Sequence, residues 1–558
     1  MMRKGQYMVK LDLKSAFWHV PIWEKHKKLL RFRWMGKLYQ MEALPFGLSA
    51  APRLFTKLLK TPMSLIRRLG ILICIYLDDM LILSDSYEEA IRARDAVIFI
   101  LQNLGFTINW EKSVIIPTTT LEFLGFILDS INMEIGLSPE KAKSLISLCR
   151  RTMSLEQIPL RELASLIGKL HSTCQAILLA PMQVRNLQKV QAEALRINAS
   201  YETMITLDVK CKSELSWWTK NLQLLGGRKM RIEEPDLILY SDASTSQGWG
   251  AATESGTRTG GQWTREERER WHINTLELIA CERAIMALSK NLNPKHILIY
   301  VDNQVALSYL NKMGGKNPHM TSIAKRIWNF AMLNGFVITG LWIPSGENKL
   351  ADEESRRTET SADWALDSQT FTEITRALGD PSVDAFASLT MHQLPKYWSW
   401  KPDPLAQGTD ALIQDWRQEF PYIFPPLCLM GRILSKIQRQ RVERAILIAP
   451  IWQNQTWFPK LIRMLIKRPI VLTPSPLILK NHQGEPHPLI SQGRMNLAAF
   501  LVSGVEWRQR DFLETLPLSS SIVEEGAQRE LTKPHGLNGL IGVIHNKLIH
   551  STALSHIL

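Results

Sequence analysis

The sequence predicts a multidomain protein that combines α/β and α+β domains. Its 558 residues are enough for about three or four domains. Short apolar runs that end in acidic residues occur near the start and again in the middle of the chain, and a Leu-rich helical stretch separates them. In the last third, strand-like runs alternate with helical ones. These observations predict several domains of strands and helices.

The first acidic run is Tyr76-Leu77-Asp78-Asp79, which lies between the apolar segments 71–75 and 80–83. Apolar segments of this length predict a β-hairpin of two buried strands with the acids at its connection. One alternative is that Asp78 and Asp79 only form the turn, because aspartate bonds its own backbone there. A third acid, Asp12, ends another strand-like segment and favours a functional cluster.

Carboxylates on neighbouring strand ends repel one another unless cations lie between them. Two divalent ions about 3.5 to 4 Å apart activate an attacking oxygen and stabilise a leaving one in phosphoryl transfer. Magnesium fits this role best because it is hard, prefers oxygen ligands and shares substrate phosphates, and manganese is the alternative. We therefore expect Asp12, Asp78 and Asp79 to be catalytic metal ligands for two ions.

Five motifs in order resemble the reverse transcriptases: DLKSAF (12–17), LPFGLSAAPRLF (44–55), YLDD (76–79), GFTINWEK (105–112) and LEFLGFIL (121–128). A chance match of five motifs in this order is improbable, although each one is weak by itself. The resemblance implies a reverse transcriptase palm over residues 1–135 and a helical thumb or connection over 136–233. It also implies RNA-directed DNA polymerase activity, with an RNA template, a DNA primer and deoxynucleoside triphosphates as partners.

The candidate substrate-binding residues of this region are Phe17, Pro45, Phe46, Gly47, Tyr76 and Lys112. Phe17 could press against the sugar and exclude a ribose 2′-hydroxyl, or it could be a core aromatic. Pro45-Phe46-Gly47 could hold a bare backbone against a base pair, although a plain loop would have the same sequence. Lys112 resembles the family's lysine that protonates pyrophosphate, with a solvated surface charge as the alternative.

The first motif lies close to the start of the chain. Asp12 follows Met1 so closely that the fingers subdomain, which precedes this motif in reverse transcriptases, is expected to be truncated. The fingers would supply basic residues around the triphosphate, so their loss would remove positioning and charge neutralisation. We therefore expect a fragment or a truncated reading frame, in which polymerisation is weakened.

A second group of acids follows the helical stretch. Two strand-like runs end in Asp242 and Asp302, a helix that begins at Asn274 carries Glu277, and a later short helix presents Asp352. The order of strands and helices predicts a layer with a mixed sheet. Alternatively, Asn274 and Glu277 form a capping box, and Asp352 only complements a helix dipole.

The strings SDAST, TLELIACERAI, YVDNQVAL and ENKLADEESR, which contain these four acids, resemble ribonuclease H in the family's order over residues 234–358. The resemblance implies a ribonuclease H-like fold in which Asp242, Glu277, Asp302 and Asp352 hold two ions and cleave the RNA of an RNA–DNA hybrid. Many family members have a histidine before the last acid, but segment 341–349 has none. We expect Glu347 or water to carry the proton, with slower hydrolysis.

Residues 359–475 predict a Rossmann-like α/β unit. This segment resembles the Dam-type adenine-N6 methyltransferase of DIRS-type retrotransposons, so the whole chain resembles a polyprotein of such an element. In that family a polar residue, two prolines and an aromatic contact the flipped base, but here Phe424 and Leu427 replace the polar and aromatic residues. We expect an inactive segment that binds nucleic acid or packs structurally. Residues 476–558 receive no function.

The composition agrees with a nucleic-acid partner. A net charge of +14 and 18 tryptophans suit a polyanion that cations grip and rings stack on. The six cysteines form no CxxC pair, and no apolar run reaches membrane-spanning length, so we expect an intracellular protein of the cytoplasm or nucleus without a membrane partner. The rival interpretation is a non-catalytic nucleic-acid-binding remnant. The sequence does not predict the oligomeric state.

Overall fold

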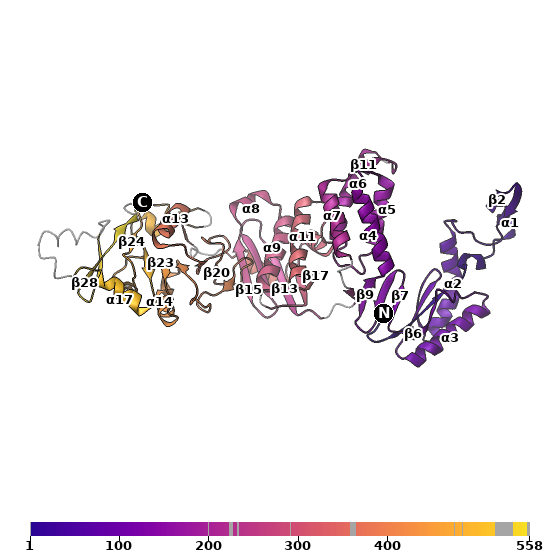
Figure 1. The fold of residues 1–558 in the computed structure, drawn as a ribbon, viewed down its shortest axis with the longest axis horizontal. Coiled ribbons are helices and arrows are strands. Elements are labelled where there is room, and N and C mark those ends of the chain that lie inside the picture. The colour runs from indigo at the N-terminus through magenta and orange to yellow at the C-terminus, as the bar shows by residue number, and fades with distance from the viewer. Residues whose placement is uncertain are drawn as a thin grey trace. The chain divides into compact units, whose positions relative to one another are not determined.

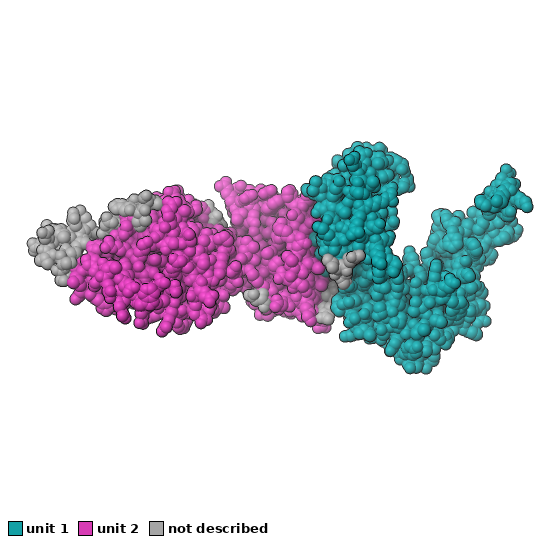
Figure 2. Space-filling view, in the orientation of Figure 1, with its two compact units in different colours: residues 1–233 teal, residues 234–558 magenta. Residues whose placement is uncertain are grey.

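A computed structural model of the chain describes residues 2–198, 200–222, 227–230, 234–290, 292–357, 364–473, 475–481, 484–518 and 539–554. The chain divides into two compact units, residues 1–233 and 234–558 (Figure 2, teal and magenta). In the described part, no helix is both long and apolar enough to cross a membrane. The domain limits predicted within each unit stay predictions.

The first unit begins with a four-stranded antiparallel sheet in the order β4-β5-β1-β6 (Figure 1). Its strands are β1 (Tyr7–Asp12), β4 (Leu72–Tyr76), β5 (Asp79–Ser84) and β6 (Val114–Thr118). β4 and β5 form the predicted hairpin, in which Tyr76 pairs with Asp79. Leu77 in the connection has a φ of +55°. The sequence-based prediction of this hairpin is confirmed.

Alternation of side chains along β1 and β5 separates the two faces of this sheet. Val9, Leu11 and Ile82 point into a core with the helices α2 (Ala51–Arg68) and α3 (Tyr87–Asn103). Residues one position away in the sequence, such as Met8 and Leu81, belong to a separate cluster on the other face. Side chains two or four positions apart in a strand point to the same face, so Asp12 lies on the face of Met8, which these two helices do not cover. A short exposed hairpin, β2 (Arg31–Trp34) and β3 (Lys37–Gln40), follows α1 (Glu24–Lys27).

A second small sheet and a helical bundle complete the first unit. The sheet has the order β12-β9-β8-β7 and consists of β7 (Thr120–Phe123), β8 (Phe126–Asp129), β9 (Glu134–Leu137) and β12 (Arg228–Lys229). The bundle consists of α4 (Pro139–Ser154), α5 (Leu160–His171), α6 (Arg185–Ile197) and α7 (Val209–Asn221). Trp218 is fully buried in its core. A short pair of strands, β10 (Gln157–Pro159) and β11 (Met204–Thr206), interrupts the otherwise helical stretch.

The second unit begins with a five-stranded sheet in the order β15-β14-β13-β16-β17. Its strands are β13 (Leu237–Ala243), β14 (Gly248–Thr253), β15 (Arg258–Gln262), β16 (His296–Val301) and β17 (Val337–Trp342). β13, β16 and β17 are parallel, whereas β14 and β15 are antiparallel to their neighbours. The mixed sheet expected from the sequence is therefore present. The accompanying helices are α8 (Arg265–Arg270), α9 (Ile273–Leu288), α10 (Gln304–Asn311), α11 (Pro318–Leu333) and α12 (Lys349–Ser355).

Helix α12 packs directly on the backbone of β14 at Gly250. A Cβ atom at this position would lie 2.2 Å from the carbonyl oxygen of Ala351 and 2.3 Å from the backbone nitrogen of Ser355. Backbone atoms cannot move away as a flexible side chain could, so any larger residue would push the helix off the sheet. Gly250 therefore determines how closely α12 approaches β14.

The rest of the second unit contains a six-stranded sheet in the order β19-β22-β23-β26-β24-β29. Its strands are β19 (Val383–Asp384), β22 (Pro421–Ile423), β23 (Ala445–Pro450), β24 (Ile470–Val471), β26 (Leu497–Val502) and β29 (Thr552–Ala553). Apolar clusters lie on both faces, and they include residues of α13 (Ser368–Leu378), α14 (Met430–Arg439) and α15 (Phe458–Arg463). This layering agrees with an α/β unit.

Two features of this sheet differ from the sequence-based expectation. β26 runs antiparallel to both β23 and β24, so the sheet is mixed and lacks the all-parallel arrangement typical of a Rossmann-like unit. The predicted limit at residue 475 also divides the sheet, because β26 and β29 lie beyond it. Residues 497–502 form a fully buried inner strand of the same sheet as β22 and β23. A helix, α17 (Glu506–Glu514), and a hairpin, β27 (Leu540–Ile544) with β28 (Lys547–His550), follow β26.

Candidate functional site

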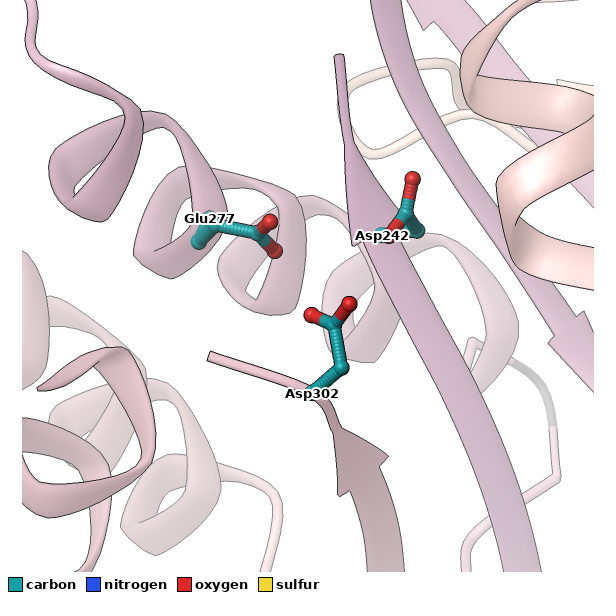
Figure 3. A group of neighbouring side chains, drawn as sticks. All are labelled: Asp242, Glu277 and Asp302. Carbon is teal, nitrogen blue, oxygen red and sulfur yellow. The ribbon is translucent and has the colours of Figure 1, made fainter. Parts of the chain in front are cut away.

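Three carboxylates from three elements converge at one edge of the sheet that contains β13 and β16 (Figure 3). One oxygen each of Asp242, Glu277 and Asp302 lies within 4.8 Å of the others. Asp242 is in β13, Asp302 follows β16, and Glu277 projects from α9. The parallel register pairs Ser241 with Val301, so the next residue of each chain segment reaches the same edge. We call these three acids the carboxylate cluster.

Burial makes the charged forms of Asp242 and Glu277 costly. Burial raises the pKa of Asp242 to about 6. A hydrogen bond from Ser355 opposes this rise, and the charges of Asp302 and Asp352 add to it. The pKa of Glu277 rises to about 9, chiefly through burial and then through Asp242 and Asp302. Only 4% of Glu277 is exposed, and its Oε2 atom has no hydrogen-bond partner. A buried oxygen without a partner is unfavourable unless a proton or a cation satisfies it.

The donor set of the carboxylate cluster fits a hard cation. Three carboxylate groups offer oxygen ligands only, and they leave a buried oxygen unsatisfied. Among the residues that the structure describes, no other three acidic, histidine or cysteine side chains come together this closely. These residues could therefore hold a metal ion, and the geometry favours this role over three unrelated surface acids.

Two serine hydroxyls contact the carboxylate cluster. Ser355 of α12 donates to Oδ2 of Asp242 at 2.6 Å, and Ser345 donates to Oδ2 of Asp302, also at 2.6 Å. Nearby, the buried side chain of Asn348 donates to the carbonyl of Ser241 at 2.9 Å. The segment 345–355 thus holds the two strands that carry the aspartates. None of these three polar residues was predicted from the sequence as part of the site.

Asp352, the fourth acid predicted for this site, lies outside the carboxylate cluster. Its side chain is 36% exposed, and Arg356 donates to Oδ1 from Nε at 2.8 Å and from Nη2 at 2.7 Å. It is near enough for its charge to raise the pKa of Asp242. Asp352 also lies in the first turn of α12, as the helix-dipole alternative requires. Its role as a metal ligand stays a prediction.

The capping-box alternative for Glu277 is wrong. Helix α9 begins at Ile273, and its N-cap is His272, whose side chain accepts from the backbone N–H of Asn274. The side-chain oxygen of Asn274 instead accepts from Asn303 at 3.0 Å. Glu277 is therefore free to point toward Asp242 and Asp302, as Figure 3 shows.

In the first unit, the acids Asp12, Asp78 and Asp79 lie together at one end of the sheet. Asp12 is directly opposite Asp79 in the antiparallel register, and the backbone N–H of Leu13 donates to the carbonyl of Asp78 at 3.1 Å. Burial raises the pKa of Asp12, and the charges of Asp78 and Asp79 act in the same direction. The structure thus brings Asp12, Asp78 and Asp79 near one another, although less tightly than the carboxylate cluster.

Several polar residues surround Asp12 and Asp79. The side chain of Asn109 hydrogen-bonds Asp12 and, with the charge of Lys112, opposes the rise in its pKa. Ser113 accepts from the backbone N–H of Asp12 at 3.0 Å. Lys10 lies 3.6 Å from Oδ1 of Asp79. Asn109 and Lys112 belong to the GFTINWEK motif that was identified in the sequence. No sequence motif indicated that Lys10 and Ser113 contact these acids.

The predicted substrate-binding residues divide into two groups. Phe17 is half-buried, with its ring 5.4 Å from that of Phe46 and 5.6 Å from that of Phe55. The Phe46 side chain is exposed, and Gly47 has a φ of +89°, which favours glycine, with open space where a Cβ would lie. Pro45 directly precedes Phe46 and belongs to the same group. The second group consists of Tyr76 and Lys112, whose side chains are exposed.

Phe17 and Phe46 meet beside the strand that ends in Asp12, so the first two motifs share one location. Whether Phe17 contacts a sugar stays a prediction, because a half-buried ring suits both a core and a binding role.

The last sheet has a buried acid that was not singled out from the sequence. Asp384, at the end of β19, accepts from the backbone N–H of Gln393 at 2.9 Å, and burial raises its pKa to about 7. Phe424, which replaces the polar residue of the methyltransferase pattern, packs against the apolar core of this domain. A core position suits phenylalanine without any contact to a base, and the expectation of an inactive segment stays a prediction.

The pH dependence of stability should reveal the buried acids. Glu277 has a folded-state pKa near 9 against an ordinary value of 4.5, so the folded state binds its proton more tightly than the unfolded state. Stability of the metal-free protein is therefore expected to fall as pH rises from about 4.5 to about 9. In EDTA, we expect an unfolding midpoint that is several degrees lower at pH 8.5 than at pH 6, as measured by calorimetry.

Glu277→Gln should flatten this dependence and raise the midpoint at pH 8.5, because glutamine cannot ionise. The exposed Glu254→Gln is the matched control and should leave the profile unchanged. An unchanged profile in Glu277→Gln would show that Glu277 does not titrate in this way.

Residues 1–128 match the family described as reverse transcriptase (RNA-dependent DNA polymerase). The Pro-Pol polyprotein of simian foamy virus type 1 is 33% identical over 123 residues, which are 22% of this chain and 10% of that polyprotein. The enzymatic polyprotein of cauliflower mosaic virus (strain NY8153) is 25% identical over 317 residues, which cover 54% of this chain and 43% of that protein. The chain thus spans less than half the length of these relatives.

Among solved structures, a foamy viral protease-reverse transcriptase in complex with dsDNA is 19% identical, with a TM-score of 0.36, and the match covers 61% of this chain and 68% of that one. The same protein in complex with an RNA/DNA hybrid matches with a TM-score of 0.36 over 64% of this chain and 48% of that one. Together with the family match, the sequence relatives identify a reverse transcriptase domain and homologues among retroviral and pararetroviral polyproteins. This part of the predicted resemblance is confirmed.

Proposed function

We propose that this chain is a retroelement enzyme that copies RNA into DNA and hydrolyses the RNA strand of the resulting RNA–DNA hybrid. Its partners would be an RNA template, a DNA primer, deoxynucleoside triphosphates and the hybrid. The single observation that carries the nuclease activity is the convergence of Asp242, Glu277 and Asp302 within 4.8 Å around an unsatisfied buried oxygen. The family match over residues 1–128 is the observation that supports the proposed polymerase activity.

At the carboxylate cluster, two magnesium ions would supply Lewis-acid stabilisation of a phosphodiester and of the attacking water. The three acids would hold the ions, and the burial of Asp242 and Glu277 would limit the access of competing water to their oxygens. Glu347 lies in the exposed loop after β17, two residues from Ser345, and is the candidate proton carrier for the leaving 3′-oxygen. Segment 341–349 contains no histidine for this step, so we expect modest rates.

At the palm, Asp12, Asp78 and Asp79 would hold the ions that activate the primer 3′-oxygen. Lys112 is close enough for its charge to act on Asp12, and its exposed ammonium could protonate pyrophosphate. The paired rings of Phe17 and Phe46 lie after the strand that ends in Asp12, where a deoxyribose would be in contact with them. This arrangement supports discrimination against a 2′-hydroxyl.

Two further assignments belong to this proposal. We place the chain among DIRS-type elements because of its methyltransferase-like segment, in which we expect no binding of S-adenosylmethionine. We also expect an intracellular enzyme.

Magnesium titration separates this proposal from the non-catalytic remnant. We expect calorimetry to detect binding that Asp242→Asn weakens at least about 10-fold, because the buried cluster loses a charged ligand. Glu254→Gln, an exposed acid of the same domain, should bind as the unchanged protein does. Binding that is absent, or that is equal in both variants, would favour the remnant.

A further inference from the structure

We infer that Ser345 and Ser355 are positioning residues of the carboxylate cluster. Each hydroxyl fixes one oxygen of an aspartate and leaves the other oxygen to bind a divalent cation. The inference rests on the proposed function, since it concerns how the same cluster prepares for its metal ions. It adds two residues that contact the metal ligands without being ligands themselves.

Ser355 holds Asp242 from the last turn of α12. Its Oγ lies 2.6 Å from Oδ2 of Asp242 and 2.9 Å from the carbonyl oxygen of Asp352, and only 1% of the residue is exposed. A hydroxyl has one proton, so these two acceptors compete for it. The shorter contact goes to the carboxylate, as expected when the acceptor is charged. When Asp242 is ionised, Ser355 therefore donates to it and restricts its rotation.

The position of this hydroxyl depends on the close contact between α12 and β14. The backbone nitrogen of Ser355 lies 2.3 Å from the place where a Cβ on Gly250 would be. Ser355 therefore stands on a helix that rests directly on the backbone of the sheet that contains Asp242. A site residue that is held by rigid elements keeps its geometry better than one on a free loop.

Ser345 holds Asp302 from the loop that follows β17. Its Oγ donates to Oδ2 of Asp302 at 2.6 Å, and the indole N–H of Trp342 donates to the backbone carbonyl of the same aspartate at 2.9 Å. Asp302 follows β16, and the two donors follow or end β17, so the contacts join neighbouring strand ends. Ser345 itself is exposed, and its replacement leaves the apolar core untouched.

The atoms that remain free indicate a ligand and not only packing. Within the described residues, no hydrogen bond reaches Oδ1 of Asp242 or Oδ1 of Asp302. Oε2 of Glu277, a residue that is 96% buried, also has no partner. Each serine thus satisfies one oxygen of an aspartate, and the cluster keeps three oxygens for a cation. Partners of this kind orient ligands, and their loss typically lowers metal affinity about 10- to 100-fold.

The test is magnesium titration calorimetry on the full chain, with the unfolding midpoint in EDTA as a second measurement. We expect Ser345→Ala and Ser355→Ala each to weaken, by about 10-fold or more, the part of the isotherm that Asp302→Asn removes. Ser345→Thr should restore the affinity, because threonine keeps the hydroxyl. Ser322→Ala, an exposed serine on α11 without a contact to the cluster, is the matched control.

The outcomes separate this inference from the proposed function. If Asp302→Asn abolishes binding but both alanine variants bind as tightly as the unchanged protein, the serines do not position the ligands, and the proposed function stands. Weaker binding in Ser355→Ala alone, with a lower midpoint in EDTA, would show a role of Ser355 in folding and would overturn the inference. Ser345→Ala keeps the test decisive, because its exposed side chain can change the magnesium affinity without changing the unfolding midpoint. If the unchanged protein binds no magnesium, both proposals fail.

Discussion

Asp302→Asn is expected to abolish magnesium-dependent cleavage of RNA in an RNA–DNA duplex, with a rate loss of more than about 100-fold. Loss of a residue that only orients a metal ligand already costs about 10- to 100-fold, and Asp302 is a ligand candidate itself. Its carboxylate lies in the carboxylate cluster, and its charge contributes to the raised pKa values of Asp242 and Glu277. Asparagine has the same shape but lacks the charge that retains a cation.

The measurement is the release of labelled RNA fragments from a hybrid, with the same strand in an RNA duplex as the substrate control. Primer extension by Asp302→Asn should be unchanged, because Asp12, Asp78 and Asp79 belong to a separate compact unit. If the unchanged protein and Asp302→Asn were equally active, or equally inert, the ribonuclease H assignment would be wrong.

Asp78→Asn should produce the reverse pattern, with primer extension reduced by more than about 100-fold and hybrid cleavage retained. Asp78 lies at the hairpin connection next to the paired Asp12 and Asp79, and its charge raises the pKa of Asp12. Removal of this charge weakens the site that would hold the ions of phosphoryl transfer. The two variants therefore act as controls for each other.

Extension is measured with deoxynucleoside triphosphates on a primed RNA template. Asp95→Asn is the matched control, since Asp95 is an exposed acid of α3 that pairs with its neighbour Arg94. Equal extension by the unchanged protein and by Asp78→Asn would contradict the assignment. A complete absence of extension that persists when upstream residues are added would also contradict it.

Local patterns in the sequence were enough to predict the strands that deliver the aspartates. The apolar segments around residues 71–83 predict paired strands, and they form the β4–β5 hairpin. The runs that end in Asp242 and Asp302 likewise form β13 and β16. In both cases the period and length of the apolar run determine the element, and the acid follows at its end.

Glu277 shows where local reasoning stops. Its spacing from Asn274 fits a capping box as well as an active site, and nothing within that segment distinguishes the two. The distinction depends on His272, which caps the helix, and on Asn303, which engages Asn274 from a distant part of the chain. The predicted limit at residue 475 falls within a sheet for a similar reason. Strand β26 joins the sheet through pairing with β23, about fifty residues earlier, which no local pattern encodes.

By itself, the sequence determined that this protein has two sets of acids at strand ends and a reverse transcriptase domain, because apolar periodicity and motif order are local properties. Only the tertiary structure decided which side chains complete each set. Ser355 meets Asp242 across 113 positions and Ser345 meets Asp302 across 43, while Asp352 turns to Arg356. The contact of Ser355 with Asp242 depends on how close α12 can approach β14 at Gly250, and packing between distant segments sets that distance.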